Sequence, residues 1–508
     1  MFRQLTSLAL ASTLLTSCGN FMPKDASGRA NSSAAALTHF QEYVETTMDK
    51  NNIPGLGISV VKDGKVILSK GFGYRDIENK TPVTEDTLFA IGSTTKAFTA
   101  TSVGILADRG DVNIDSPVKD YLTDFELMDA QATKEATPRD LMLHRTGIPR
   151  HEFVWLFSPD SREQLYNKLK YLPSSAPFRS EWQYNNFMFM TTGLLIEKLS
   201  GNSWESFVHD EILSPLGMNR TDFSVNDMEK DADAALGYLS SKTQEPVNVP
   251  YMKIDAMGPA GSMNSSAKEM AQWVLLNLNE GVSGDGQIIS QESLEEIHRP
   301  QMKITSSSRP ELSDLNYGLA WVAHEYSGHK LVWHNGSIDG FSALVSFLPE
   351  EELGIVILMN SSNSTNLLDL ALVAYDELLG LPFTDWVGKY EQEHEETKPT
   401  YDPTEPVLPL ESYVGEFVHP AYGIVQTKVV QDGDKKRLVA TLHTIDINLL
   451  PAKAPGGVEN AAHVFFAEGF SFAPFVQFGE KEDGTIETLQ WQLEPDKRVK
   501  PILFERQN

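Results

Sequence analysis

The spacing of apolar residues predicts a helix, a hairpin and a second helix in the first part of the chain. In LTHFQEYVETTMDKNN, apolar residues at 37, 40, 44 and 48 form one stripe at helical spacing. The run GISVVKDGKVILSKG alternates as a strand does, and the Asp63-Gly64 pair at its centre is typical of a two-residue hairpin turn. TTKAFTATSVGILADRG is a long apolar helical run that ends at Gly110.

Strand-like runs return after a long, mostly helical middle. HKLVWHNG, FSALVSFL and LGIVILMN lie between His329 and Asn360, and PEEE marks the turn between the last two. The helical run STNLLDLALVAYDELLG follows and stops at Gly380. Because strands and a helix occur at both the start and the end of this stretch, we predict one sheet to which both ends of the domain contribute.

The composition changes near residue 387, where the chain becomes acidic and rich in proline. Such a stretch is typical of a linker, which we place at 387–408 after a large domain at 34–386. The last hundred residues alternate short apolar strands with Gly, Asp and Pro turns, so 409–508 is predicted to be a small all-β, barrel-like domain. We expect few contacts to cross between the two domains at the linker near 391–406.

The N-terminus predicts export. MFRQLTSLALASTLLTSCGN has a basic residue, a short, mostly apolar segment and then small residues, which is typical of a signal peptide over 1–17. Cys18, the single cysteine, ends LLTSC, which resembles the lipobox of bacterial lipoproteins. The resemblance implies a lipidated Cys18, a tether over 18–33 and, because Gly19 rather than aspartate follows, an outer-membrane anchor facing the periplasm. The alternative is an ordinary cleaved signal with an incidental cysteine.

Composition and charge narrow the classes of partner. The 508 residues are 41% hydrophobic and 22% charged, which is ordinary for a soluble globular body. The formal net charge is −28, from 42 basic and 70 acidic side chains. This balance argues against nucleic acid and against anionic membrane surfaces as partners. We therefore expect a small-molecule or peptide substrate, with the membrane reached through the lipid anchor only.

The pattern Ser-x-x-Lys occurs five times, and its surroundings separate the copies. One lies in a strand of the hairpin, two lie in a polar loop or a turn, and one directly precedes a predicted helix, which Ser266 and Glu269 would cap. Only Ser93 opens a long apolar helix. The five serines are Ser59, Ser93, Ser116, Ser265 and Ser327.

Ser93 and Lys96 form a candidate catalytic pair. Residues three apart on a helix lie on one face with their β-carbons about 5–6 Å apart, so the lysine amine can reach the hydroxyl. A lysine partly buried beside alanine and phenylalanine has a lowered pKa and can activate a serine.

Two further motifs follow in order along the chain. Tyr184 is the only one of fifteen tyrosines with asparagine two residues later, at Asn186. His334 is the only one of twelve histidines with glycine two residues later, at Gly336. Ser-x-x-Lys, then Tyr-x-Asn, then Lys/His-x-Gly is the signature of serine β-lactamases and penicillin-binding proteins.

The chain resembles the class C β-lactamase-like serine hydrolases, which are related to the penicillin-binding proteins and include D-peptidases and esterases. The resemblance covers roughly 37–381 and includes LMLHRTGIP (141–149) and GPAGSMNSSAKEMAQW (258–273). It implies an α/β fold, with an antiparallel sheet flanked by helices and a further all-helical region. The segment that opens LESYVGEFVHPAYG resembles the lipocalin-like module that follows the catalytic domain in some members.

The resemblance also implies roles for single residues. Ser93 would be the acylated nucleophile and Lys96 its proton acceptor or electrostatic partner. Tyr184 would act with Lys96 as general base and then protonate the leaving group, and Asn186 would hydrogen-bond the substrate amide. The N–H groups of Ser93 and Ser337 would form the oxyanion hole.

His334 departs from the β-lactamase pattern, which has lysine there, and Gly336 keeps it. An unperturbed histidine has a pKa near 6.5 and is largely uncharged at neutral pH, so we expect slow β-lactam turnover. Hydrolysis of carboxylate-bearing substrates should improve below about pH 6.5. No cofactor is implied. HEYSGH imitates a zinc motif, but His324 and His329 are five apart, whereas a helical zinc pair is four apart, so no metal site is expected.

The sequence thus favours a serine hydrolase that forms an acyl-enzyme with an ester or amide, such as a D-peptide, a peptidoglycan-like peptide or a carboxyl ester. The alternatives are a true class C β-lactamase and, from another class, a non-catalytic penicillin-binding envelope protein. Loss of the serine, lysine or tyrosine would mark the last of these, and all three residues are present.

Overall fold

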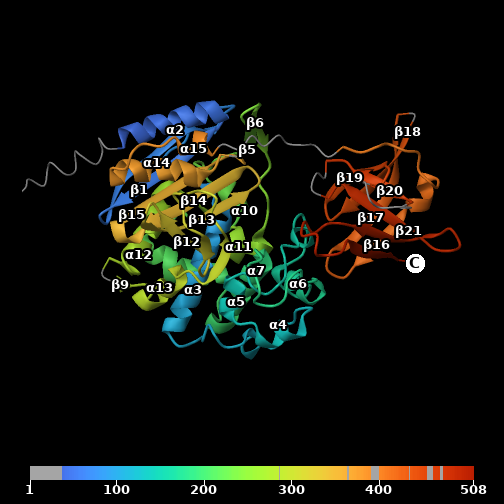
Figure 1. Cartoon of the computed structure of the whole chain (residues 1–508), viewed down its shortest axis with the longest axis horizontal. Helices are drawn as coiled ribbons and strands as arrows, with labels where there is room; N and C mark the ends of the chain where they lie inside the picture. The colour runs from blue at the N-terminus through green and yellow to red at the C-terminus, as the bar shows by residue number, and fades with distance from the viewer. Residues whose placement is uncertain are drawn as a thin grey trace, which may run out of the picture.

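A computed structural model describes residues 37–284, 286–362, 365–390, 400–433, 435–454, 462–469 and 473–507. Figure 1 shows a large α/β body on one side and an all-β unit on the other. Cys18 and the predicted signal and tether lie outside the described residues. Within the described ranges, no helix is both long and apolar enough to cross a membrane.

The body is built on one nine-stranded sheet with the order β10-β11-β12-β13-β14-β15-β1-β2-β3. All neighbours are antiparallel, and β1 from the start of the domain pairs with β15 from its end. This pairing confirms the predicted sheet to which both chain ends contribute. The strands are β1 (Gly55–Lys62), β2 (Lys65–Asp76), β3 (Thr81–Pro82), β10 (Met302–Thr305), β11 (Leu315–Tyr317), β12 (Val322–Tyr326), β13 (His329–Ile338), β14 (Phe341–Leu348) and β15 (Leu353–Met359).

Helices cover both faces of this sheet, so its central strands are apolar on both sides. Along β15, Ile355 and Ile357 pack with α2 (Thr38–Asn51) and α14 (Leu367–Leu379). The intervening Val356 belongs to the core on the opposite face. Because side chains alternate along a strand, the continuous apolar run supplies two cores at once. Figure 1 shows α2 and α14 along one side and α12 and α3 along the other.

The hairpin turn and the helix ends lie at the residues that the sequence predicts. Asp63 and Gly64 both have positive φ, 49° and 70°, as a type I′ turn between β1 and β2 requires. Gly380 ends α14 in the left-handed conformation. The Ser266 side chain accepts a hydrogen bond from the Glu269 N–H and caps α12.

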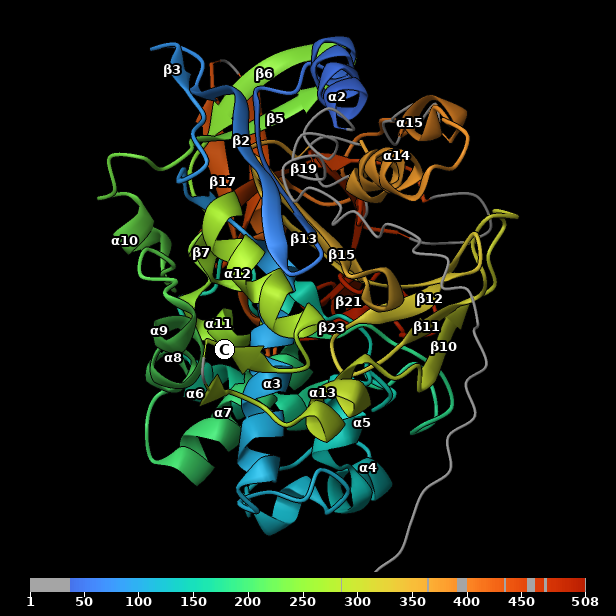
Figure 2. The same cartoon turned by 90° about the vertical axis from the view of Figure 1, so that its left-hand side faces the viewer.

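An all-helical region packs below the sheet (Figure 2), as expected. At its centre α3 and α7 pack together, and α11 contacts both. The α-helices beyond α2 and α14 are α3 (Thr95–Asp108), α4 (Ala130–Glu135), α5 (Pro138–Met142), α6 (Arg162–Tyr166), α7 (Asn186–Ser200), α8 (Trp204–Val208), α9 (Ser214–Leu216), α10 (Val225–Met228), α11 (Gly258–Gly261), α12 (Ala267–Leu278), α13 (Gln291–His298) and α15 (Trp386–Lys389). Short strands outside the main sheet are β4 (Phe89–Ala90), β5 (Gly237–Ser241), β6 (Gln244–Val249), β7 (Asn264–Ser265), β8 (Val282–Ser283) and β9 (Gly286–Gln287).

The C-terminal unit is a closed barrel of eight strands, β16 to β23, in chain order. β16 pairs with β23, so no edge is left open. Tyr413, Phe417 and Phe478 form part of its buried aromatic core. The strands are β16 (Gly415–His419), β17 (Gly423–Asp432), β18 (Lys435–Leu442), β19 (Ile445–Pro451), β20 (Val464–Ala467), β21 (Phe475–Glu480), β22 (Ile486–Trp491) and β23 (Ile502–Arg506). The predicted fold class, an α/β domain followed by a barrel, is confirmed.

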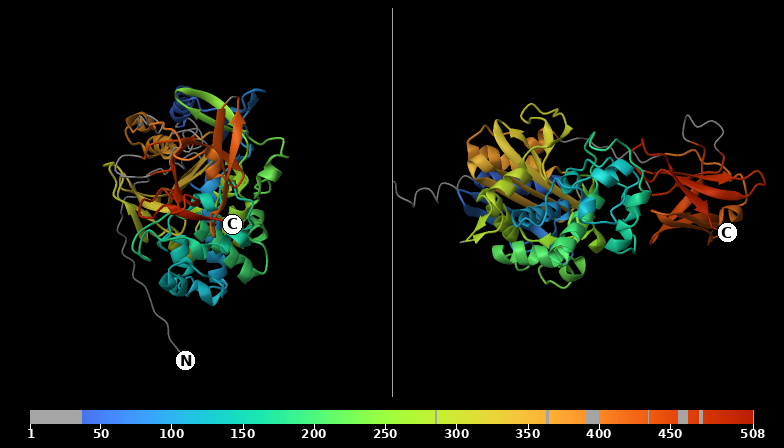
Figure 3. Two further views of the ribbon diagram at one scale, coloured as in Figure 1. Left: turned by 90° about the vertical axis from the view of Figure 1, so that its right-hand side faces the viewer. Right: turned by 90° about the horizontal axis from the view of Figure 1, so that it is seen from below.

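Two expectations about the domain junction differ from the structure. The predicted start of the linker, residue 387, falls inside α15, which belongs to the body because the Trp386 indole N–H donates to the buried Asp376 carboxylate (2.7 Å). Contacts between barrel and body are also more numerous than a simple linker predicts. The His443 side chain bonds the Phe153 carbonyl (2.8 Å), for example, and the barrel lies beside the segment around residues 150–180 (Figure 3).

Candidate active site

Ser93 and Lys96 lie side by side, although Ser93 is in a 3-10 turn rather than in the helix. The turn Gly92–Thr94 leads directly into α3, whose second residue is Lys96. The Lys96 Nζ atom lies 3.0 Å from the Ser93 Oγ atom. Lys96 is fully buried, whereas Ser93 stays partly exposed. A substrate can therefore reach the hydroxyl while the amine remains shielded from water.

Tyr184 comes to the same hydroxyl from the loop that precedes α7. Its phenol donates a hydrogen bond to the Ser93 Oγ atom over 2.7 Å. The following residue, Asn185, fixes this loop, because its N–H donates to the His144 ring (3.1 Å) and its side chain donates to the Ile148 and Pro149 carbonyls. The buried His144 thus has a structural contact with this loop.

Lys96 is surrounded by acceptors rather than by an acidic partner. Apart from its contact with Ser93, the Nζ atom donates to the Asn186 Oδ1 atom (2.7 Å) and to the Ala260 carbonyl (2.6 Å). Burial lowers the pKa of Lys96 well below its ordinary value, and the nearby Arg150 guanidinium lowers it further. The amine is therefore favoured over the ammonium.

The pKa of Tyr184 shifts in the other direction. Burial raises it far above its ordinary value, although the hydrogen bond to Ser93 opposes the shift. Tyr184 therefore stays a neutral phenol near pH 7 and acts as a donor. The two shifts have opposite directions: burial favours the neutral amine of Lys96 and the neutral phenol of Tyr184.

Asn186 is placed differently from its expected role. Its carbonyl oxygen accepts from Lys96, and its amide nitrogen donates to both carboxylate oxygens of Glu152 (3.1 and 3.4 Å). Both ends of the side chain are thus engaged inside the protein. In this arrangement Asn186 orients Lys96.

His334 lies on β13 beside the site, but it does not titrate as expected. Its Nε2 atom is 2.9 Å from the Tyr317 hydroxyl and its Nδ1 atom is 2.6 Å from the Asn335 carbonyl, which fixes the proton on Nδ1. Burial, with a contribution from Lys96, lowers the pKa of His334 to about 3. The expected gain in positive charge below pH 6.5 is therefore wrong, because a fully buried imidazole has no water to solvate its cation.

Glycines let β13 approach the turn that holds Ser93. A β-carbon at Gly336 would overlap the Ile91 carbonyl oxygen, and one at Gly92 would lie 2.8 Å from the Ser337 nitrogen. Gly92 also has a positive φ of 51°. The Ser93 and Ser337 backbones are thereby brought together at the edge where Ser337 is exposed.

The sequence did not single out a charged pair at the mouth of the site, Arg150 and Glu152. The Arg150 guanidinium lies 4.7 Å from the centre of the Tyr184 ring, and its Nε atom donates to Glu152 (2.9 Å). Burial raises the pKa of Glu152. Both residues directly follow the segment 141–149, which resembles the family near its active site. Charged residues adjoining that segment were the available signal.

The other serines and histidines noted in the sequence lie elsewhere. Ser59 bonds the Ser69 hydroxyl in the hairpin, and Ser265 bonds the Thr221 hydroxyl. His324 accepts from the Trp333 indole. His329 instead pairs with Glu351. The two histidines of HEYSGH thus have different partners.

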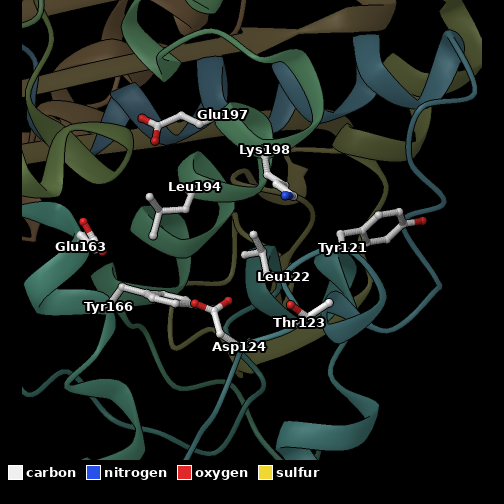
Figure 4. A pocket seen from close by; sticks show the side chains of 9 residues that line it. All are labelled: Tyr121, Leu122, Thr123, Asp124, Glu163, Tyr166, Leu194, Glu197 and Lys198. Carbon is white, nitrogen blue, oxygen red and sulfur yellow. The ribbon is translucent and has the colours of Figure 1, made fainter.

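Figure 4 shows the side chains that line a pocket in the helical region. The volume of this pocket is about 600 Å³. No predicted site residue lines it. Its acidic side chains and one lysine make an ordinary solvated surface, in which the Tyr166 hydroxyl donates to Asp124 (3.2 Å). The lining residues are Tyr121, Leu122, Thr123, Asp124, Glu163, Tyr166, Leu194, Glu197 and Lys198.

The antiparallel sheet, the helical region below it and the serine, lysine and tyrosine at their junction define the class of β-lactamases and penicillin-binding proteins. The chain belongs to this family: the sequence pattern described as Beta-lactamase matches residues 40–377.

Proteins similar to this chain come from several different organisms. Unguisins hydrolase ungD′ of Aspergillus campestris is 32% identical over 432 residues, covering 79% of each chain. Protein flp of Staphylococcus aureus is 27% identical over 324 residues, covering 62% of this chain and 61% of its own. The solved octameric penicillin-binding protein homologue from Pyrococcus abyssi has 24% identity and a TM-score of 0.62, covering 92% of this chain and all of its own. The last likeness establishes the fold alone.

Proposed function

We propose that the chain is a serine hydrolase that cleaves an ester or amide through an acyl-enzyme, with Ser93, Lys96 and Tyr184 as its catalytic residues. One observation carries this proposal: the Ser93 Oγ atom lies between the Lys96 Nζ atom (3.0 Å) and the Tyr184 hydroxyl (2.7 Å). A related protein named a hydrolase, with 32% identity, supports the general class.

The hydrogen bonds around Lys96 favour the amine as the base. A neutral amine has two N–H groups and one lone pair. Its two N–H groups would bond Asn186 and Ala260, which leaves the lone pair to accept the Ser93 proton. Tyr184 meanwhile donates to the same oxygen. This assignment satisfies every partner of Lys96.

The reaction then follows in two steps. As the Ser93 Oγ atom bonds to the substrate carbonyl carbon, its proton moves to Lys96, and the N–H groups of Ser93 and Ser337 hold the developing oxyanion. The leaving group departs with the Tyr184 proton, which Lys96 replaces. Water then cleaves the acyl-enzyme with the same groups acting in reverse.

The substrate is proposed to be a D-peptide, a peptidoglycan-like peptide or a carboxyl ester rather than a β-lactam. The reason is the strand motif on β13, where the neutral, buried His334 offers no cation at the position at which β-lactamases have lysine. A charged hydrogen bond is worth about 1.5–3 kcal/mol, so its loss costs roughly 10–100-fold.

The test is labelling of Ser93 by a fluorophosphonate, followed by intact mass measurement and a panel of esters and D-peptides. We expect Ser93→Ala to abolish labelling and to lower kcat/KM by about 10⁴-fold or more. Ser265→Ala is the matched control, because Ser265 also begins a Ser-x-x-Lys pattern but bonds Thr221. Labelling that survives Ser93→Ala would overturn the proposal.

We further propose that the chain is exported and anchored through a lipid on Cys18. The lipobox-like LLTSC supports this location. Cys18→Ser should abolish palmitate incorporation, and recovery of wild-type protein without detergent would contradict it.

A further inference from the structure

The accessible charge beside Ser93 belongs to Arg150. Lys96 is fully buried and His334 is 3% exposed, whereas the Arg150 side chain is 48% exposed. The Arg150 guanidinium lies over the Tyr184 ring, whose hydroxyl contacts Ser93. Of these three residues, only Arg150 presents an exposed side chain beside the Ser93–Tyr184 pair.

Glu152 orients Arg150 without covering it. One edge of the guanidinium, at Nε, bonds Glu152, whose oxygens also accept from Asn186. Among the described residues, no hydrogen bond uses the Nη atoms of Arg150. A guanidinium with free Nη donors can bind a carboxylate through two parallel hydrogen bonds. Glu152 is only 15% exposed, so Arg150 is the member of the pair that a ligand can reach.

Hydrogen bonds from the barrel hold His151, the residue between Arg150 and Glu152. His151 has the left-handed conformation (φ 46°, ψ 42°). This conformation costs a non-glycine residue free energy and persists only where contacts with the surroundings hold it. Its N–H donates to the Glu494 carboxylate (2.6 Å), and its Nδ1 atom accepts from the Tyr422 hydroxyl (2.7 Å). The opposite ring nitrogen donates to the Pro173 carbonyl (2.8 Å).

Both Glu494 and Tyr422 belong to the barrel: Tyr422 lies in the turn between β16 and β17, and Glu494 follows β22. The turn between β18 and β19 adds a second contact, where His443 and Thr444 donate to the carbonyls of Phe153 and Phe157. The segment that contains Arg150 and Glu152 is thus fixed from outside the catalytic domain.

We infer that Arg150 binds an acidic group of the substrate next to the scissile bond, and that the barrel positions Arg150 through His151. The inference rests on the proposed function of Ser93. It names the substrate class as esters or amides with a carboxylate near the reacting carbonyl, and it gives the C-terminal barrel a role in substrate recognition.

The test compares matched chromogenic esters. 4-Nitrophenyl butyrate is neutral, the 4-nitrophenyl monoester of glutaric acid has its charge on the acyl side, and the butyrate of a carboxylated nitrophenol has it on the leaving side. We expect Arg150→Gln to lower kcat/KM for at least one anionic ester by about 10–100-fold, mainly through KM. The neutral ester should lose less than that anionic ester, because the effect of Arg150 on the Lys96 pKa is common to all three esters whereas the contact with the carboxylate is not. Arg109→Gln is the matched control, because Arg109 pairs with Glu211 on the surface.

Barrel variants test the second half of the inference in the full chain. Tyr422→Phe removes one hydrogen bond to His151. We expect it to lower the anionic preference, meaning the ratio of kcat/KM for the anionic ester to that for the neutral ester, about 3–10-fold. Tyr413→Phe removes the same kind of bond, to His463 inside the barrel (2.8 Å), and should leave the preference unchanged. Added salt should weaken the preference in the wild type but not in Arg150→Gln, which a purely structural role would not produce.

The outcomes separate the two proposals. If Ser93→Ala keeps activity, the proposed function is wrong. If activity depends on Ser93 but Arg150→Gln lowers all three esters equally, or none, the inference about Arg150 is wrong. Arg150→Lys keeps the positive charge but loses the paired N–H donors of the guanidinium. Its kcat/KM for the anionic ester should lie between those of the wild type and Arg150→Gln, and this variant provides the test if the glutamine variant does not fold.

Discussion

The Tyr317 hydroxyl lies 2.9 Å from the Nε2 atom of His334, deep in the sheet beside the site. Because the Asn335 carbonyl fixes the proton on Nδ1, Nε2 is an acceptor and Tyr317 is its donor. Protonating His334 would turn Nε2 into a donor, which reverses this bond, and would bury a cation close to Lys96. The histidine on β13 therefore acts as a neutral hydrogen-bonding residue, unlike the lysine found there in β-lactamases.

The first prediction concerns pH and His334. Its pKa of about 3 means that it gains no charge between pH 5 and 8. We expect the ratio of kcat/KM for an anionic and a neutral ester to have the same pH dependence in wild type and in His334→Gln over that range. A rise below pH 6.5 that appears in the wild type and is lost in the variant would show that His334 titrates after all.

The second prediction concerns Lys96. Burial lowers the pKa of Lys96 and so favours the amine, which the proposed mechanism needs; acid converts the amine to an ammonium that could no longer accept the Ser93 proton. We expect kcat/KM to be constant near neutrality and to fall about tenfold per pH unit below the Lys96 pKa. If kcat/KM instead kept rising towards pH 10, the ordinary range of a lysine pKa, Lys96 would not be a neutral base near pH 7.

The third prediction tests whether Lys96 and Tyr184 act as one unit. Both contact the same oxygen, so removing either one breaks the proton path between them. We expect Lys96→Met, Tyr184→Phe and the double variant to lose similar amounts of kcat, about 10³-fold or more. If the free-energy losses of the two single variants simply add in the double variant, the shared path is absent.

Much of the fold was predictable because its signals are local. The alternation in β1 and β2, the Asp63-Gly64 turn and the helix that ends at Gly380 each depend on a few neighbouring residues. The position of Ser93 was predictable because only one Ser-x-x-Lys pattern opens an apolar helix. These features follow from side-chain spacing and backbone preference, which the sequence displays directly.

The features that were missed depend on contacts between distant segments. The sequence cannot indicate that Tyr317 and Asn335 fix the tautomer of His334, or that Asn186 is engaged by Glu152. The left-handed His151 has no local marker, and its hydrogen bonds with Tyr422 and Glu494 join residues far apart in the sequence. The contacts of His151 appear only when the barrel and the body are placed together.

The fourth prediction concerns stability around Asp140. Its carboxylate is fully buried at the start of α5 and bonds both Arg145 and Arg179. Burial alone would raise the pKa of Asp140, but these hydrogen bonds hold it below its ordinary value. The stabilisation is therefore present above about pH 4, the ordinary carboxyl pKa, and is lost as the pH falls through the lower folded-state value.

We expect Asp140→Asn to lower the free energy of unfolding by about 3 kcal/mol at neutral pH, because two guanidinium groups lose their charged partner. Asp115→Asn is the control: Asp115 also pairs with an arginine, Arg139, but is 60% exposed, so its loss should cost less than about 1 kcal/mol. Urea unfolding from pH 7 to pH 3 measures both effects. Equal losses in the two variants would refute a special role for Asp140.

The last prediction isolates the approach of β13 to the Ser93 turn. Gly336 does not have a positive φ, so a side chain there is excluded by space alone: a β-carbon would overlap the Ile91 carbonyl oxygen. Gly336→Ala must therefore move β13 away from the turn and separate the Ser93 and Ser337 N–H groups. Loss of one oxyanion donor typically costs about 10²–10³-fold in kcat, and we expect a loss of that size. Gly286→Ala, whose β-carbon would come no closer than 3.8 Å to any neighbour, is the control. Stopped-flow kinetics with a nitrophenyl ester and thermal unfolding would be measured for both variants. A Gly336→Ala protein that is folded and retains the wild-type kcat would mean that the two N–H groups do not act together on the substrate.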